Sequence, residues 1–381
     1  CAAEIELGGC LPKARAVVAG ADVASADRLL GLAYLLPLGE GAAAHAGSRG
    51  WRWTGRAGQG PAALRPGPPH VARFRPGDAG RYPNLAKAKG IADLGTHRIE
   101  DGAIKTFPCL ALDSCEDDGR GGLRGRPMLV MLKGDVDRLG RIFAHGLGAG
   151  WSLARGAALS RMMDLYFTLR LPALLATDFP QTYTLYAGGD DFLLIAPWWQ
   201  GLELALSLRE DFRAFTGGNP NLTFSLGAAL FDPRTPVSTA AREAETRLEA
   251  AKAAGRDRIS VIEEAPMTWD EFKRALEAAE RFNAWLREGR LAASALYRLL
   301  ALDEARRRVA EGRGRGADHG WRAKLAYHLA RLRPASGEGK VPAEVFDACR
   351  GLFGIGPDWK APPTPAPGLR VTLSHALYRN R

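Results

Sequence analysis

The segment Thr182–Pro197 reads TYTLYAGGDDFLLIAP, two apolar, β-prone runs separated by the tetrapeptide Gly188-Gly189-Asp190-Asp191. Because glycine tolerates the positive φ of a tight turn, this pattern predicts a β-hairpin with two carboxylates at its tip. Adjacent carboxylates repel each other and are costly to desolvate unless a cation lies between them. The hairpin tip is therefore the first candidate for a cation-dependent site.

A second acidic segment lies upstream, where the apolar run Met128–Leu132 continues as KGDVD at 133–137. The run predicts a buried strand that ends in carboxylates. If that strand pairs with the hairpin, the two acidic segments meet and offer the oxygen ligands that hard divalent cations prefer. Such an arrangement suggests nucleotidyl transfer, in which carboxylates hold two Mg²⁺ or Mn²⁺ ions.

The carboxylates can be given separate roles in this chemistry. Asp135 and Asp190 are the candidate metal ligands, supported by the Val136 carbonyl. Asp191 is a further ligand or a proton acceptor, so Asp190 and Asp191 are the candidate catalytic residues. Asp137 is expected to point to the opposite face from Asp135 if the strand persists, which leaves its role open.

Other residues are candidates for contact with a nucleotide. Gly188 and Gly189 would let a base or ribose approach the backbone closely. Lys252, one turn before the end of an alanine-rich helix, either reaches a phosphate or simply complements the helix dipole. Ser160 lies within a helical pattern, where it is either a surface residue or a substrate contact.

The order of elements in the central region predicts a ferredoxin-like palm. The expected elements are a strand at 128–132, helices from 139 and over 153–175, the hairpin, a helix over 200–215, a strand at 221–230, a helix at 239–254 and a strand at 258–262. This order fits the split βαβ arrangement of polymerase and cyclase palms, which brings the first strand and the hairpin side by side.

The flanking regions differ from the palm in composition. Residues 1–122 carry short β-like pieces at 15–18, 32–36 and 51–53 between Gly- and Pro-rich turns, and are interpreted as a β-rich connector. Residues 266–381 have helical periodicity over 269–288, 292–308 and 321–333. The prediction is an α+β protein in three parts: a connector at 1–122, a palm at 123–265 and a basic helical domain at 266–381.

Charge and composition limit the possible partners. The net charge is +10, and residues 266–381 hold 21 Lys or Arg against 13 Asp or Glu. That surplus favours a polyanionic partner such as RNA, or it lies on ordinary solvated faces. No run approaches eighteen apolar residues, so no membrane partner is expected. Five cysteines without a C-x-x-C pair favour the reducing cytoplasm.

Several motifs occur together in this chain: GDVDRLG at 134–140, SLARGAALSRMMDLYF at 152–167, LYAGGDDFLLIAPW at 185–198, NPNLTFSLGAAL at 219–230 and A-E-x5-A-K-x2-G-R at 244–256. Taken together, they resemble the large subunit of type III CRISPR effector complexes, in particular the Csm (III-A) form. The resemblance implies a palm that converts ATP to cyclic oligoadenylate with Mg²⁺ or Mn²⁺ when guide and target RNA are bound among other effector subunits. It implies that Asp135, Asp190 and Asp191 serve metal and catalysis. Gly188, Gly189, Ser160 and Lys252 would then surround ATP.

The sequence also departs from that family. Arg138 stands where the family usually has Asn, which is expected to alter a surface contact. The chain starts without methionine, so we expect it to begin partway through a longer protein, without the family's nuclease domain and first palm. Because the first palm supplies half of the paired ATP site, this chain alone is expected to cyclise poorly. A stand-alone cyclic-dinucleotide synthase and a catalytically silent scaffold are the alternatives.

Overall fold

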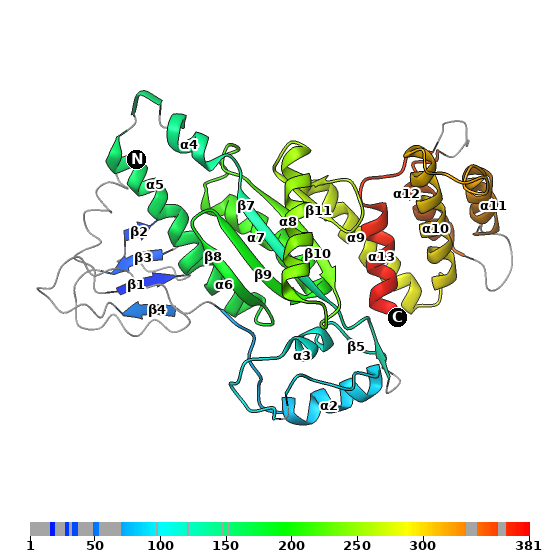
Figure 1. Cartoon of the computed structure of the whole chain (residues 1–381), viewed down its shortest axis with the longest axis horizontal. Helices are drawn as coiled ribbons and strands as arrows, with labels where there is room; N and C mark the ends of the chain where they lie inside the picture. Colours follow the sequence, from blue (N-terminus) through cyan, green and yellow to red (C-terminus); the bar gives the residue numbers. More distant parts are fainter. Residues whose placement is uncertain are drawn as a thin grey trace, which may run out of the picture.

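The computed structural model of the chain describes residues 70–96, 98–119, 122–146, 148–150, 152–332, 341–356 and 363–381, together with the backbone of four strands nearer the N-terminus (Figure 1). Those strands are β1 (Ala16–Ala19), β2 (Asp27–Leu29), β3 (Ala33–Leu36) and β4 (Arg49–Arg52), and they form one sheet in the order β2-β3-β1-β4. The β-like pieces expected at 15–18, 32–36 and 51–53 overlap β1, β3 and β4. The strand β2 was not predicted.

The rest of the N-terminal region is not purely β. It contains the helices α2 (Asp78–Lys89) and α3 (Phe107–Leu112) and a two-stranded ribbon of β5 (Glu116–Asp117) and β6 (Leu123–Arg124). The helices are joined by buried polar groups, since the Tyr82 hydroxyl and the Lys105 ammonium both donate to the Asp113 carboxylate. The β-rich description of this region is therefore incomplete, because a six-residue apolar run such as 107–112 carries no period that separates strand from helix.

The central sheet has the predicted palm topology. Its strands are β7 (Leu129–Val136), β8 (Tyr183–Gly188), β9 (Asp191–Pro197), β10 (Phe224–Phe231), β11 (Arg258–Val261) and β12 (Met267–Thr268), in the order β12-β11-β10-β7-β9-β8. The inner four, β10-β7-β9-β8, are all antiparallel, as in a split βαβ fold. Only β10 and β11 run parallel, across the helix α8 (Val237–Ala253). The α+β palm is thus confirmed.

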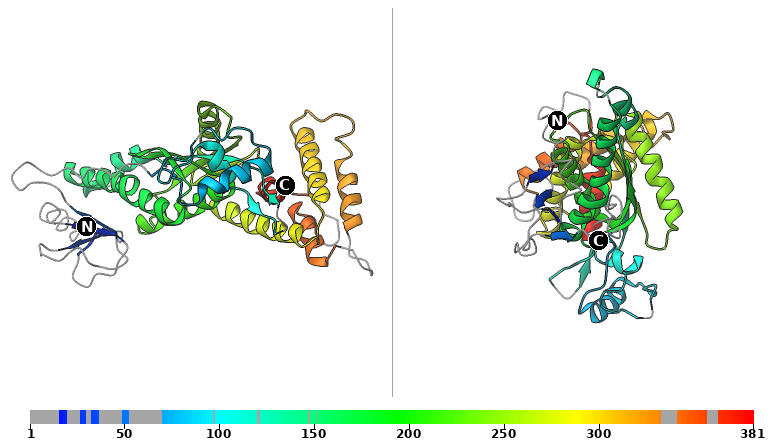
Figure 2. Two further views of the ribbon diagram at one scale, coloured as in Figure 1. Left: turned by 90° about the horizontal axis from the view of Figure 1, so that it is seen from below. Right: turned by 90° about the vertical axis from the view of Figure 1, so that its left-hand side faces the viewer.

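Helices cover both faces of this sheet, which explains why β7 is a continuous apolar run (Figures 1 and 2). One face packs on α5 (Leu153–Leu165), the π-helical turn Tyr166–Arg170, α6 (Leu171–Asp178), α7 (Trp198–Phe215) and α9 (Trp269–Arg287). The other face packs on α3 and α8. Gly227 of β10 lies so close to α8 that a Cβ there would meet the Ala244 carbonyl oxygen at 2.1 Å. Close helix packing therefore needs glycine at this position.

The C-terminal region is helical, as predicted. After α9 come α10 (Ala293–Ala310), α11 (Trp321–Leu332), α12 (Ala343–Leu352) and α13 (Leu369–Asn380), around a second hydrophobic core. The helix α9 begins with a capping box, in which Thr268 and Glu271 each accept from the other's backbone N–H. Its buried residues enter both the palm core and the helical core. No helix in the described part of the chain is long and apolar enough to cross a membrane.

The last helix, α13, lies between the palm and α10 rather than forming a free tail (Figure 1). Most of its residues are buried, and Val371 joins the palm core while Leu373 joins the helical core. The predicted border at 265–266 falls just before β12, which extends the palm sheet, so sheet and helices are continuous there. The three-part division remains a prediction.

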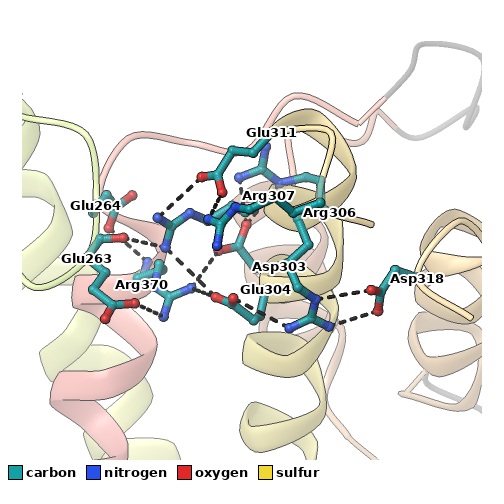
Figure 3. Close-up of polar contacts among 11 residues, drawn as sticks. Glu263, Glu264, Asp303, Glu304, Arg306, Arg307, Glu311, Asp318 and Arg370 are labelled. Carbon is teal, nitrogen blue, oxygen red and sulfur yellow. Dashed lines mark hydrogen bonds and ion pairs between the residues drawn. The ribbon is translucent and has the colours of Figure 1, made fainter. Parts of the chain in front are cut away.

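A polar cluster joins the palm to the helical region (Figure 3). The Glu264 carboxylate, from the loop after β11, accepts the backbone N–H groups of Gly368, Arg370 and Val371 at 2.8–3.2 Å. It therefore caps the N-terminus of α13 from more than a hundred residues away in sequence. The Arg370 guanidinium in turn lies 2.7 Å from the Glu304 carboxylate of α10.

We expect Glu264→Ala to lower the free energy of unfolding by roughly 2 kcal/mol, because three N–H groups of α13 lose their acceptor. Glu264→Gln should lose less, since its amide oxygen still accepts. The matched control is Glu263→Ala, which removes an exposed carboxylate 3.7 Å from Arg370 and should change the free energy by under about 0.5 kcal/mol. Urea unfolding curves measure all three, and equal losses at 263 and 264 would contradict the capping role.

Candidate functional site

The two acidic segments lie side by side, as the sequence predicted. The strand β7 pairs with β9 so that Asp135 is directly opposite Asp191, and the Val136 N–H donates to the Asp190 carbonyl at 2.8 Å. Gly189, with φ of +68°, makes the turn that carries Asp190. Backbone pairing therefore fixes the hairpin tip against the acidic end of β7.

Packing decides which face of the sheet these carboxylates occupy. Phe192, next to Asp191, is buried in the core on the α5–α7 face, and its ring covers Gly134. A Cβ at residue 134 would lie 2.2 Å from that ring, so only glycine fits there. Since side chains alternate along a strand, Asp135 and Asp191 face the other way, toward α8.

The helix α8 supplies a cation to this face. The Lys252 ammonium lies 3.1 Å from the Asp135 carboxylate and 3.1 Å from that of Glu249. Burial raises the pKa of Asp135, and the nearby Asp190 raises it further, while Lys252 opposes both effects. The pKa of Lys252 is raised despite its own burial, because the Asp135 carboxylate stabilises the ammonium. The site thus concentrates negative charge that Lys252 partly neutralises.

The oxygen atoms at this site are of the kind that bind Mg²⁺. Mg²⁺ is usually held by one or two carboxylates and by substrate phosphates, with water completing its shell. Asp135 and Asp190 with the Val136 carbonyl would provide such oxygen donors at the joined strand ends. Among the residues that the structure describes, no three or more His, Cys, Asp or Glu side chains are grouped to hold a metal without other ligands. The described side chains alone would therefore not complete the coordination shell of such an ion.

The candidate nucleotide-contact residues differ in their surroundings. Nothing within 4 Å would meet a Cβ at Gly189, and the nearest atom for Gly188 is the Tyr186 hydroxyl oxygen at 3.9 Å, so the tip backbone is open. Ser160 is exposed on α5, and no hydrogen bond in the described residues joins it to the hairpin. Lys252 reaches Asp135 directly. The structure therefore brings Lys252, but not Ser160, into contact with the acidic residues.

Two residues that the sequence reasoning did not single out belong to this site. The exposed Tyr186 donates from its hydroxyl to the Gly188 carbonyl at 3.1 Å, and Asp191 raises the pKa of that hydroxyl. A β-bulge between Thr184 and Tyr186 displaces this residue, and no sequence signal marks the bulge. Asp257 donates its backbone N–H to the Asp137 carboxylate at 3.0 Å.

Asp137 does not follow the orientation considered from the sequence. The expectation of opposite faces was wrong, because residues two positions apart along a strand lie on the same face. The strand β7 in any case ends at Val136. The Asp137 carboxylate instead turns to Ser225 of β10, whose own Cα lies opposite that of Asp135. Asp135 and Asp137 therefore lie on the same side of the sheet, because side chains directly opposite in an antiparallel pair share a face.

A cavity among the described residues lies away from the acidic site. A hollow of about 460 Å³ is bounded by the end of β10 and the start of α8, including Phe231, Thr235 and Thr239. Phe231 pairs with Leu129, at the opposite end of β7 from Asp135. The hollow is thus separate from the acidic end of the sheet.

Residues 128–260, which contain all of the acidic site, match the family described as Cas10/Cmr2, second palm domain. Cas10/Csm1 of subtype III-A from Mycobacterium tuberculosis, described as a CRISPR system single-strand-specific deoxyribonuclease, is 30% identical over 279 residues, or 68% of this chain and 32% of the relative. The protein of the same description from Thermococcus onnurineus is 35% identical over 177 residues, or 42% of this chain and 21% of the relative. This chain belongs to the Cas10 family.

Solved structures of Cas10/Csm1 proteins share the fold. A Csm1-Csm4 cassette in complex with cA3 matches 74% of this Cas10 chain and 38% of its own, with a TM-score of 0.54 and 25% identity. Csm1 of T. onnurineus matches 73% and 40%, with a TM-score of 0.52 and 26% identity. This Cas10 chain thus spans about a fifth to a third of the two curated relatives' length.

Arg138, which stands where the Cas10 family usually has Asn, lies at a backbone position with unusual dihedral angles. Arg138 has φ of +56°, the left-handed region, immediately before α4 (Leu139–His145). Asparagine tolerates that conformation better than other non-glycine residues, which explains why Asn suits this turn. Arginine at this position keeps the turn but bears a steric cost.

Proposed function

We propose that this chain is the nucleotidyltransferase part of a type III-A effector large subunit and converts ATP to cyclic oligoadenylate when target RNA is bound. The observation that carries the proposal is the pairing of Asp135 with Asp191, with Lys252 beside them, within a Cas10 second palm. The Csm1-Csm4 cassette with cA3, a cyclic oligoadenylate, supports the choice of product.

Each acidic residue then has a place in the reaction. Asp135 and Asp190, with the Val136 carbonyl, would hold Mg²⁺ or Mn²⁺, which when bound would polarise the attacking hydroxyl and offset the charge of the leaving pyrophosphate. Asp191 would complete the ligand set or accept the proton of the hydroxyl. Lys252, whose ammonium lies 3.1 Å from the Asp135 carboxylate, would pair with a phosphate that binds there.

The remaining candidate residues would bind the nucleotide itself. The open backbone at Gly188 and Gly189 allows a base or ribose to lie against the hairpin tip. Ser160 would contact ATP from α5, and its exposure leaves its hydroxyl available to do so. These assignments and the three-part domain division belong to the proposal.

The proposed partners are the other effector subunits, guide CRISPR RNA and target RNA, in the cytoplasm. Much of the C-terminal positive charge is already paired internally, as for Arg306, Arg307 and Arg370 (Figure 3). Exposed cations nevertheless remain on α10 and α11, among them Arg298 and Arg331. Association with an RNA-bearing assembly should therefore weaken as the salt concentration rises.

The test is product formation by the assembled complex with ATP or GTP, each with and without complementary target RNA. We expect oligoadenylates only from ATP and only with RNA. Product from GTP without RNA would instead support a stand-alone cyclic-dinucleotide synthase. No product under any condition would leave the palm as a silent scaffold and reject the proposal.

A further inference from the structure

The Asp137 carboxylate is enclosed by donors. It is 3% exposed, and one of its oxygens accepts the Thr223 hydroxyl at 2.8 Å and the Asp257 N–H at 3.0 Å. Its other oxygen accepts the Ser225 hydroxyl at 2.7 Å. The Asp137 N–H also donates to the Thr223 carbonyl at 2.8 Å. A carboxylate held in this way is engaged within the protein and is not presented to a ligand.

Its donors come from two segments that meet at the end of β7. Thr223 and Ser225 lie at the start of β10, whereas Asp257 lies in the turn between α8 and β11. That turn is strained, because Arg256 and Asp257 have φ of +67° and +47°. The Asp257 carboxylate is held in turn by Arg209 of α7 at 2.9 Å. Through these hydrogen bonds, Asp137 connects the strained turn and the start of β10 to the end of β7.

We propose that Asp137 is a positioning residue for the metal-binding carboxylate of Asp135 and for Lys252. Asp135 lies two residues before it on β7, and Lys252 lies in the last turn of α8, five residues before Asp257. Fixing the end of β7 to the turn after α8 therefore sets the relative position of the two groups that meet at 3.1 Å. This inference rests on the proposed function, because it assigns Asp135 to a metal ion.

Charge is the competing explanation, since Asp137 also contributes negative charge beside Asp135. Asp137→Asn separates the two effects. Its amide oxygen can still accept from Thr223 and Asp257, while the Ser225 hydroxyl can turn to accept from the amide nitrogen. Asparagine at residue 137 therefore keeps these hydrogen bonds and loses the negative charge, whereas alanine loses both.

The experiment measures Mn²⁺ binding to the full chain by electron paramagnetic resonance, without ATP. The Asp135→Ala variant identifies the signal that belongs to the palm site. Asp137→Ala should weaken that binding at least tenfold, the scale of effect known for residues that orient metal ligands. Asp137→Asn should stay within about threefold of wild type. If alanine at 137 prevents folding, Ser225→Ala removes one donor and should weaken binding about threefold.

The matched control is Asp113→Ala. Asp113 is also a buried aspartate that accepts from a hydroxyl and an ammonium, but it joins α2 to α3 and makes no described hydrogen bond to the hairpin tip. Its variant should bind Mn²⁺ as wild type does. Unchanged binding in Asp137→Ala, or equal losses in the Asn and Ala variants, would overturn the positioning role even if wild type turns over ATP. Absence of ATP turnover by the wild-type complex with target RNA, with the Mn²⁺ pattern as expected, would reject the proposed function alone.

Discussion

Replacing Asp190 and Asp191 together with alanine is expected to lower the rate of ATP conversion at least a hundredfold. Both carboxylates lie at the joined ends of β7 and β9, where Asp135 alone would remain to hold the ion. Metal-dependent phosphoryl transfer depends on charge neutralisation at this point, so loss of two ligands removes most of the rate enhancement. The assay is product formation from ATP by the complex with target RNA.

The same variant should fold normally, because the contact that fixes the hairpin tip is made by backbone atoms. The Val136 N–H donates to the Asp190 carbonyl, which alanine retains. The matched control is Asp164→Ala, an exposed aspartate of α5 in the same palm, which should leave activity within about twofold. Full product yield from the double variant would remove the catalytic assignment.

The second large effect concerns acid stability and rests on His375. This histidine of α13 is 2% exposed, and its ring packs on that of Trp198 at 5.0 Å between centroids. Burial lowers the pKa of His375 to about 3, and the neighbouring Arg379 acts in the same direction. Glu280 of α9, 3.8 Å from the imidazole, is the one described carboxylate in ion-pair range of it.

The sign of the effect follows from proton binding. A histidine in the unfolded chain takes up a proton near pH 6.5, whereas in the folded protein His375 stays neutral down to about pH 3. The unfolded state therefore binds more protons in this interval, and stability falls as the pH falls. The full contribution is roughly 4 kcal/mol, reached when the pH approaches 3.

His375→Leu should flatten this part of the profile, because leucine keeps an apolar contact with Trp198 and cannot take up a proton. Urea midpoints between pH 7.5 and pH 4, followed by tryptophan fluorescence, measure the difference between variant and wild type. His319→Leu, at an exposed histidine, is the control and should leave the pH slope unchanged. Parallel profiles for wild type and His375→Leu would contradict the assignment.

The palm sheet could be predicted because its signals are local. The alternation and turn residues of 182–197 specify a hairpin whatever surrounds it, and the apolar run before Asp135 specifies a buried strand. With the order of the helices, these elements allow few topologies. The helices α9, α10 and α11 were likewise predicted from their periodicity, whereas α12 and α13 were not. The apolar run 107–112 was not resolved as a helix, because a run of that length has no distinguishing period.

The surroundings of the site could not be predicted, because they depend on contacts between residues far apart in the sequence. Nothing near Lys252 or Asp137 in the sequence specifies that Lys252 reaches Asp135 or that Asp137 accepts from Ser225. The β-bulge next to Tyr186 arises from the pairing of β8 with β9, and no pattern in the amino-acid sequence marks it.

Local sequence patterns were sufficient to predict the α+β palm, the hairpin that carries Asp190 and Asp191, and their approach to Asp135. Periodicity and turn chemistry are properties of short segments, so they can be read without tertiary information. Tertiary contacts alone showed that α13 joins the two cores, that Glu264 caps it and that Asp137 is enclosed by donors. Burial and hydrogen-bond satisfaction depend on which distant segments meet, and that is settled only when the whole chain packs.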